Sequence, residues 1–355
     1  MNAFFVSILN GIHSVVHNYG WTIVVFTVLI RLVLMPLDYR SRKSMRKMST
    51  ISAQTAALQK KYANDKDKLN RKMSELYKKE GVNPLSGCIP MLIQWPILII
   101  MFNAMRSMTN DQTLNQVFQY LAHPDAVANI ESLSLDSWMW IKNIWQPDSL
   151  FASIIPDSRS LSIIGWDVWK AAFERLSEID QGTIRATVEA LGGVIDWTTE
   201  AAGKASVQYL IDALAKTSTY SMAIEPISSA WNNVNVFVFH FTVFKHYNGL
   251  LILPALAALT QVAMNKLNPA QTGQTTMDPQ RDAAQASTGK MMQIFFPLLS
   301  VWFCLTSNAG FALYWVTSNV VMGVMTIMMN KYLNKKDASG TGTKPVKTPV
   351  GTSIK

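Results

Sequence analysis

One charged side chain stands inside an apolar run of this sequence. The stretch from Val24 to Met35, VVFTVLIRLVLM, is apolar except for Thr27 and Arg31. An arginine at the centre of a membrane-spanning helix costs roughly 2.5 to 3.5 kcal/mol of insertion free energy, so such residues usually serve a function. The chemistry of a guanidinium there is electrostatic, because it attracts and hydrogen-bonds anionic or polar groups. The alternative is that the side chain snorkels to nearby headgroups.

Motifs for catalysis or metal binding are absent from the sequence. It contains no HExxH, GxSxG or CxxC pattern, each of which places reactive groups at a fixed spacing. His13 and His17 are four residues apart without an acidic neighbour, which favours a surface pair over a metal site. Cys88 and Cys304 fall at or within apolar runs and form no disulfide or metal framework. We therefore predict no enzymatic activity, no metal and no cofactor.

Five apolar runs predict membrane-spanning helices. A spanning helix needs about 20 residues, with a range of about 17 to 25. The third and fourth runs are short and, taken alone, equally fit buried helices of a soluble protein. The pattern as a whole indicates an all-α polytopic membrane protein. We place its five transmembrane helices at 20–37, 89–107, 249–265, 291–305 and 309–330.

The distribution of basic residues predicts the orientation of the chain. Of 32 Lys and Arg residues, 22 lie in the segments 38–88, 266–290 and 331–355. The segment 108–248 instead has eight Lys or Arg and fifteen Asp or Glu. By the positive-inside rule, the amino terminus then lies outside and the carboxy terminus in the cytoplasm.

The predicted cytoplasmic segments differ in character. Residues 38–88 have a helical pattern with a narrow apolar seam, which predicts a basic helical hairpin. We interpret 266–290 as a loop. Residues 331–355 are poor in apolar side chains and rich in Gly, Thr, Pro and Lys, so they predict a disordered basic tail.

Two segments are predicted to lie outside the cytoplasm, residues 1–19 and 108–248. Residues 1–19 have helical amphipathic spacing, which fits a helix on the outer membrane surface or, equally, a packed helix without lipid contact. The extracytoplasmic segment 108–248 contains a long, mainly helical insert at about 150–248. Within it, the apolar run 234–244 is too short to span a membrane and is either a strand or an interfacial stretch.

Polar side chains recur in the predicted spans. Each one alone is more often an interhelical hydrogen bond, worth about 0.6 kcal/mol, than a functional group. Together they favour a wet cavity, and the two short spans would thin the bilayer beside it. A hydrophilic segment could begin to cross there at a lower desolvation cost. An intramembrane charge is also typical of a transporter or channel, which stays our alternative, although no repeat of the spans is evident. A third reading makes the external segment a receptor or quality-control domain on an inert anchor.

Several motifs, in order, resemble those of the YidC-type membrane protein insertases. They are RLVLMPL at 31–37, NPLSGCIP at 83–90, WIK at 140–142, QPD at 146–148 and AGFALYW at 309–315. The resemblance covers most of the chain outside 150–248. It implies a bacterial plasma-membrane insertase whose five helices surround a hydrophilic groove that is open to the cytoplasm and to lipid. The groove would attract the polar, often acidic, translocated end of a client protein.

The resemblance also implies roles for individual residues. Arg31 would stand at the centre of the groove and Trp315 would face it. The family usually carries a glutamine near the inner end of the third span, where this chain has Met264, and we expect Gln261 to take its place. The predicted client-binding residues are Arg31, Thr27, Gln94, Gln261, Trp315, Ser318 and Asn319.

Partners follow from the same resemblance. The hairpin, represented by Arg42, Lys43, Arg46 and Lys47, would be needed for activity. The tail lysines Lys335, Lys336, Lys344 and Lys347 are candidate ribosome contacts, with anionic lipid as the alternative ligand. Nascent membrane proteins and membrane lipids are the expected partners, translating ribosomes and the Sec translocon are further candidates, and DNA is not one.

Overall fold

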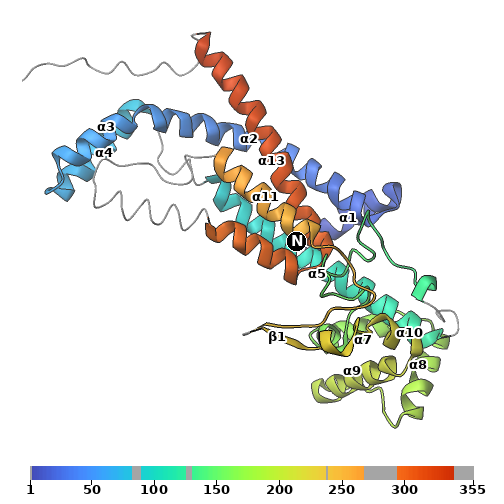
Figure 1. Cartoon of the computed structure of the whole chain (residues 1–355). Coiled ribbons are helices and arrows are strands. Elements are labelled where there is room, and N and C mark those ends of the chain that lie inside the picture. The colour runs from blue at the N-terminus through green and yellow to red at the C-terminus, as the bar shows by residue number, and fades with distance from the viewer. Residues whose placement is uncertain (1, 82–88, 125–129, 237–238, 268–293, 340–355) are drawn as a thin grey trace, which may run out of the picture. The chain divides into compact units, whose positions relative to one another are not determined.

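The computed structural model describes residues 2–81, 89–124, 130–236, 239–267 and 294–339 (Figure 1). Within these ranges the chain is mostly helical, and it divides into two compact units. Unit 1 comprises Met1–Phe26, Ile100–Leu256 and Val301–Trp315. Unit 2 comprises Thr27–Ile99, Ala257–Ser300 and Val316–Lys355.

The apolar helices have the lengths expected of a membrane protein. Among the described residues, Tyr19–Ser44 and Ala309–Ala338 are long and apolar enough to cross a bilayer. They belong to α2 (Tyr19–Thr50) and α13 (Ala309–Ala338). Helix α5 (Ile89–Ala122) is 34 residues long and contains Pro96. Shorter apolar helices are α11 (Ile252–Leu267) and Ile294–Thr306. These helices confirm the prediction of a mostly helical chain, and their length and apolar composition are consistent with a membrane protein.

Two of the helices continue past the residues where their apolar runs stop. Helix α2 runs to Thr50, although its apolar run ends at Leu37. Helix α13 runs to Ala338, through residues that the sequence had assigned to a disordered tail. The added turns are rich in Lys, Arg, Met and Leu, all strong helix formers, so loss of apolar character alone does not end either helix.

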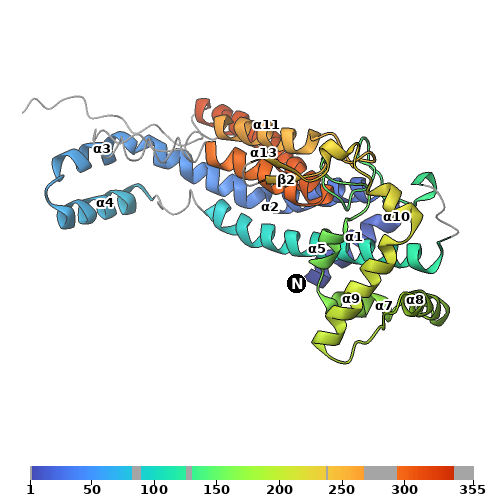
Figure 2. The ribbon, with the colours of Figure 1, turned by 60° about the horizontal axis from the view of Figure 1, so that its bottom comes forward.

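A helical hairpin follows α2 in unit 2. It consists of α3 (Ser52–Lys61) and α4 (Lys66–Glu80), which lie side by side in both views (Figures 1 and 2). Asp65 begins α4 by accepting a hydrogen bond of 2.9 Å from the backbone N–H of Lys68, which satisfies one unpaired amide of the first turn. Gly81 ends α4 at φ 61°, a left-handed conformation that glycine adopts without steric cost.

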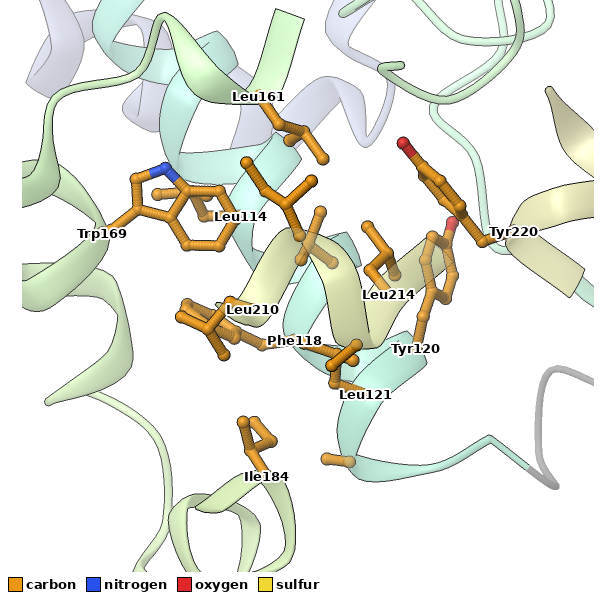
Figure 3. Packing of buried hydrophobic residues seen from close by; sticks show 14 of the residues in the cluster. Leu114, Phe118, Tyr120, Leu121, Leu161, Trp169, Ile184, Leu210, Leu214 and Tyr220 are labelled. Carbon is orange, nitrogen blue, oxygen red and sulfur yellow. The ribbon is translucent and has the colours of Figure 1, made fainter. Parts of the chain in front are cut away.

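The insert of unit 1 packs its helices around the end of α5. Figure 3 shows Leu114, Phe118 and Leu121 of α5 facing apolar side chains from the insert helices. Trp169 and Leu210 are fully buried in this cluster. The helices are α6 (Ser158–Ser162), α7 (Trp166–Phe173), α8 (Glu178–Ala190), α9 (Glu200–Ala215) and α10 (Ser218–Ala223), with short 3-10 turns at Ile130–Ser132 and Ser229–Trp231.

A β-hairpin and an amino-terminal helix complete unit 1. Strands β1 (Val234–Val236) and β2 (Phe239–Phe241) pair antiparallel. The apolar run 234–244, for which the sequence allowed a strand or an interfacial stretch, therefore contains these strands. Helix α1 (Asn2–Val16) buries Leu9 completely and keeps Phe4 exposed. The aromatic ring of Phe5 packs 6.0 Å from that of Phe26.

Candidate functional site

Arg31 lies on α2 in unit 2 and is almost completely buried, with 5% of its surface exposed. Its Nε donates a hydrogen bond of 2.8 Å to Oγ of Ser318 on α13, and Nη2 donates to the same oxygen. Thr27, one turn earlier on α2, is also buried. A buried guanidinium needs polar partners to offset its lost hydration. The side chain therefore reaches toward α13 rather than to lipid headgroups.

Two further arginines tie α2 to α13. Nη2 of Arg42 donates to Oγ1 of the buried Thr326. Nη2 of Arg46 donates to the backbone oxygen of Asn330 at 3.1 Å, and its Nη1 lies 3.2 Å from Oδ2 of Asp337. The bonded partners are separated by 287 residues at Arg31 and 284 at Arg42 and Arg46. This nearly constant separation means that the two helices run parallel.

These contacts revise the interpretation of the basic residues after the first span. Arg42 and Arg46 had been assigned to the cytoplasmic hairpin, as had Lys43 and Lys47. All four lie on α2, before the hairpin of α3 and α4 begins. Sequence periodicity could not reveal their partners, because those partners lie almost 290 positions away. For Arg42, a polar residue within an apolar stretch, Thr326, was a signal in the sequence.

The predicted third-span residues lie next to α13. Nδ2 of Asn319 donates to Oγ1 of Thr260 on α11 at 3.3 Å. Gln261 follows Thr260 and is half-buried. Met264 is buried, and its Sδ would be in ordinary van der Waals contact, at 3.5 Å, with a Cβ added at Gly323. Helices α11 and α13 therefore pack against each other at this point. Asn319 is therefore engaged by the residue adjoining Gln261.

Trp315 belongs to unit 1, whereas Arg31 belongs to unit 2. Its indole Nε1 is buried without an acceptor among the described residues, and its ring lies 6.2 Å from that of Phe311. The side chain of Gln94 lies outside the described residues, as do Lys344 and Lys347. Lys335 and Lys336 form part of the last turn of α13.

The sequence did not reveal the role of Asp148, which organises the start of α11. Asp148 is fully buried. Its Oδ1 accepts from the backbone N–H of Leu250 at 2.8 Å, and its Oδ2 accepts from that of Leu253 at 2.7 Å. Nε1 of Trp140 also donates to Oδ2, at 3.1 Å. The carboxylate thus satisfies amides at the amino end of α11, where it also complements the positive end of the helix dipole.

Asn248 forms a second polar anchor beside Asp148. Its Nδ2 donates to the backbone oxygens of Asn143, Gln146 and Pro147 at 2.8, 3.1 and 3.0 Å. Its Oδ1 accepts from the backbone N–H of Asn143 at 2.7 Å. The WIK and QPD motifs therefore hold the chain that enters α11. No cluster of three or more His, Cys, Asp or Glu able to bind a metal occurs in the part of the chain that the structure describes.

Comparison with known families identifies the class of protein. The family model described as "60Kd inner membrane protein" matches residues 11–177 and 199–336. The matched residues make up most of the chain and include Arg31, Asp148 and Ser318. The chain therefore belongs to this family of inner membrane proteins, as the sequence motifs had indicated.

Individual relatives carry the name "Membrane protein insertase YidC". The protein of Janthinobacterium sp. (strain Marseille) is 35% identical over 152 residues, which cover 43% of this chain and 23% of the relative. That of Fusobacterium nucleatum subsp. nucleatum is 38% identical over 125 residues, or 35% of this chain and 61% of the relative. That of Aromatoleum aromaticum is 44% identical over 95 residues, or 27% of this chain and 17% of the relative. The aligned part is thus less than two thirds of each relative.

Proposed function

We propose that this protein is a membrane protein insertase that uses the positive charge of Arg31 to draw the polar, translocated end of a client into the membrane. The family match and the names of the relatives support the insertase activity. The observation that carries the mechanism is the burial of Arg31 among apolar helices, with Ser318 as its hydrogen-bond acceptor. In this account five spans surround a hydrophilic groove that is centred on Arg31, and Gln94, Gln261 and Trp315 contribute to it.

The partner of Arg31 matters for the electrostatics of this mechanism. Ser318 is neutral, so its hydrogen bond holds the guanidinium in place without cancelling the charge. At an effective dielectric constant of about 20, two opposite charges about 4 Å apart attract by about 4 kcal/mol. A client carboxylate that approaches Arg31 would gain part of this energy, which offsets the cost of leaving water.

Asp38 moderates the field around Arg31. It lies on α2, is half-buried, and interacts electrostatically with Arg31 and Arg42. Seven residues separate Asp38 from Arg31, or about 10 Å along a helix. At that distance the carboxylate weakens the attraction of a client without removing it, and so favours release after transfer.

Hydrophobic partition supplies most of the driving free energy. Burying one methylene contributes about 0.8 kcal/mol, so an apolar client segment gains far more from lipid than from one charge pair. Helices α11 and α13 both expose large apolar side chains in unit 2. They include Leu259 and Val262 on α11 and Val320, Val324 and Met328 on α13. The client segment would slide into lipid along these two helices.

The orientation and partners complete the proposal. The amino terminus lies outside and the carboxy terminus in the cytoplasm, where the basic hairpin of α3 and α4 and the end of α13 meet translating ribosomes. Lys335 and Lys336 on α13, with Lys344 and Lys347 beyond it, are the candidate contacts. Crosslinking from Lys335 to ribosomes that carry a membrane-protein nascent chain, but not to empty ribosomes, tests this contact.

The experiment that tests the insertase activity uses proteoliposomes that contain only this protein. The client has one apolar segment and a short acidic translocated end, and protease protection of that end reports insertion. We expect protection in proteoliposomes and none in empty liposomes. A second client with the acidic residues replaced by Lys should be protected less, because Arg31 repels it. Equal protection with and without the protein would overturn the proposal.

A further inference from the structure

The β1–β2 hairpin carries an apolar surface that the proposed insertase mechanism does not use. From Pro226 to Phe244 the sequence contains no Asp, Glu, Lys or Arg, although the surrounding external segment is rich in acidic residues. Successive residues of a strand point to opposite faces, so cross-strand pairs alternate between the faces. The pairs are Val234 with Phe241, Asn235 with His240 and Val236 with Phe239. Val234 and Phe241 therefore share one face, and Asn235 lies on the other.

Exposed apolar side chains continue from this face into the base of the hairpin. Phe151, Ile227 and Trp231 are 43%, 56% and 50% exposed. The ring of Phe151 packs 4.8 Å from that of Phe241. The backbone of Val243 is hydrogen-bonded to Ile227 and to Trp231. Its oxygen accepts from the N–H of Ile227 at 2.9 Å, and its N–H donates to the oxygen of Trp231 at 3.0 Å. We call this surface, formed by Phe151, Ile227, Trp231, Val234 and Phe241, the hairpin patch.

An isolated two-stranded hairpin is at best marginally stable in water. Figure 1 shows β1 extending away from α7 and α10 of the same unit. Covering the hairpin patch by an apolar phase would stabilise the strands, because the exposed parts of Phe151, Ile227 and Trp231 would then leave water.

The hairpin is held close to the point where the chain enters an apolar membrane helix. Phe244 forms an antiparallel bridge with Pro226, and Tyr247 forms one with Ser153. Asn248 follows directly and is locked to the loop of Asn143 and Pro147. Asp148 then fixes the first turn of α11, beside the exposed Leu250. Only ten residues separate the end of β2 at Phe241 from the start of α11 at Ile252.

We propose that the hairpin patch inserts into the interfacial region of the outer lipid leaflet. The patch is apolar, and the chain leads from its strand β2 to the apolar helix α11 within ten residues. It is also uncharged, so it has no like-charge repulsion with anionic headgroups. Trp231 provides an apolar ring with a polar N–H, which is the chemistry favoured at headgroup level. The exposed Asn235, on the opposite face, would remain in contact with the headgroups and water. The insert is thereby held against the membrane at a second place besides its chain ends.

Spin labels test this placement in proteoliposomes that contain only this protein. In a background with Cys88→Ser and Cys304→Ala, the label is attached at Val234→Cys on the hairpin patch. The matched control is Glu189→Cys on the exposed face of α8. Collision rates with molecular oxygen, which concentrates in lipid, and with a water-soluble nickel chelate give the depth of each label. We expect the oxygen-to-nickel ratio to be at least about five times higher at Val234→Cys than at Glu189→Cys.

A second label guards against local unfolding of the strand. Ile227→Cys lies on the hairpin patch outside the strands and is more than half exposed, so it should show the same high ratio. Equal ratios at all three sites would overturn the proposal. Protection of Val234→Cys from both reagents would also overturn it. If the label then shows dipolar broadening, a second copy of the chain covers the patch. If it shows none, the patch is buried within the chain itself. No client is used, so failure here leaves the insertase proposal untouched.

Discussion

Arg31 and Ser318 are 287 positions apart in the chain, yet their Nε and Oγ atoms lie 2.8 Å apart in the interior of unit 2. Both residues are buried. The bond joins α2 to α13 through a charged donor and a neutral acceptor. The bond therefore holds the guanidinium in place without neutralising it, because Ser318 carries no charge.

Replacing Ser318 with alanine separates the positioning of Arg31 from its charge. Removing the acceptor of a buried charged donor costs about 1.5 to 3 kcal/mol, so Ser318→Ala should lower the unfolding temperature in detergent. Client insertion should stay above about half of the wild-type level, because the charge is still present. Thr317→Ala, at a half-buried neighbouring site, serves as the control and should change neither. Loss of insertion at an unchanged unfolding temperature would show that the hydroxyl itself acts on clients.

Asp148→Asn should loosen the start of α11. The carboxylate accepts from two backbone N–H groups and from the indole of Trp140, whereas an asparagine turns an NH₂ group toward at least one of these donors. We expect a cost of about 2 to 3 kcal/mol and faster hydrogen exchange at Leu250 and Leu253. Asp157→Asn removes one oxygen from a single exposed cap on α6 and should cost about 1 kcal/mol or less. Equal exchange in the two variants would contradict the assigned role of Asp148.

The core of the insert can be weakened without exposing α5. Trp169→Ala removes a fully buried indole and should destabilise the insert by about 3 to 5 kcal/mol. Deleting the insert instead would expose Leu114 and Phe118 of α5 and confuse the result. In the Trp169→Ala protein, limited proteolysis should cut between α7 and α9, while client insertion persists. Ile179→Ala, at a site that is 79% exposed, is the control. Parallel loss of insertion and of protease resistance would show that the insert takes part in insertion.

Alkaline pH should destabilise the insert through Tyr220. Burial raises the pKa of its hydroxyl to about 12, and the nearby Asp157 adds to the rise; the hydroxyl donates to the backbone oxygen of Pro156 at 3.1 Å. The folded-state pKa is above the unfolded value of about 10, so the stability of this group is complete below pH 10 and is lost as the pH rises toward 12. Circular dichroism of the protein and of Tyr220→Phe from pH 9 to 12 measures this. A loss of helix of the same size and midpoint in both would contradict the prediction.

The sequence predicted the class of the fold better than the contacts within it. The apolar runs and the ordered motifs indicated a helical membrane protein of this family, and the helices and the family match confirm both. Arg31 was recognisable because a charge within VVFTVLIRLVLM is costly. Its bond to Ser318 was not, since no local pattern links residues that are almost 290 positions apart.

Other misses have equally physical causes. Helix α13 extends to Ala338 because helix propensity outlasts apolar character at its end. Asp148 looked like any acidic residue of an external loop, and only the folded chain brings it to the amides of Leu250 and Leu253. The run 234–244 carried too few residues to separate a strand from an interfacial stretch, and the pairing of Val234 with Phe241 resolves the strand.

The most direct test of the central claim compares charge variants at Arg31 in proteoliposomes. With the acidic client, Arg31→Lys should keep most of the insertion, Arg31→Ala should lose at least about tenfold, equivalent to about 1.4 kcal/mol, and Arg31→Glu should lose more. Arg106→Ala, at an exposed arginine of α5, should insert clients as well as the wild type does. Protease protection of the translocated end gives each rate. The order Lys, Ala, Glu supports attraction by the buried charge, whereas equal insertion by Arg31→Lys and Arg31→Glu would contradict it.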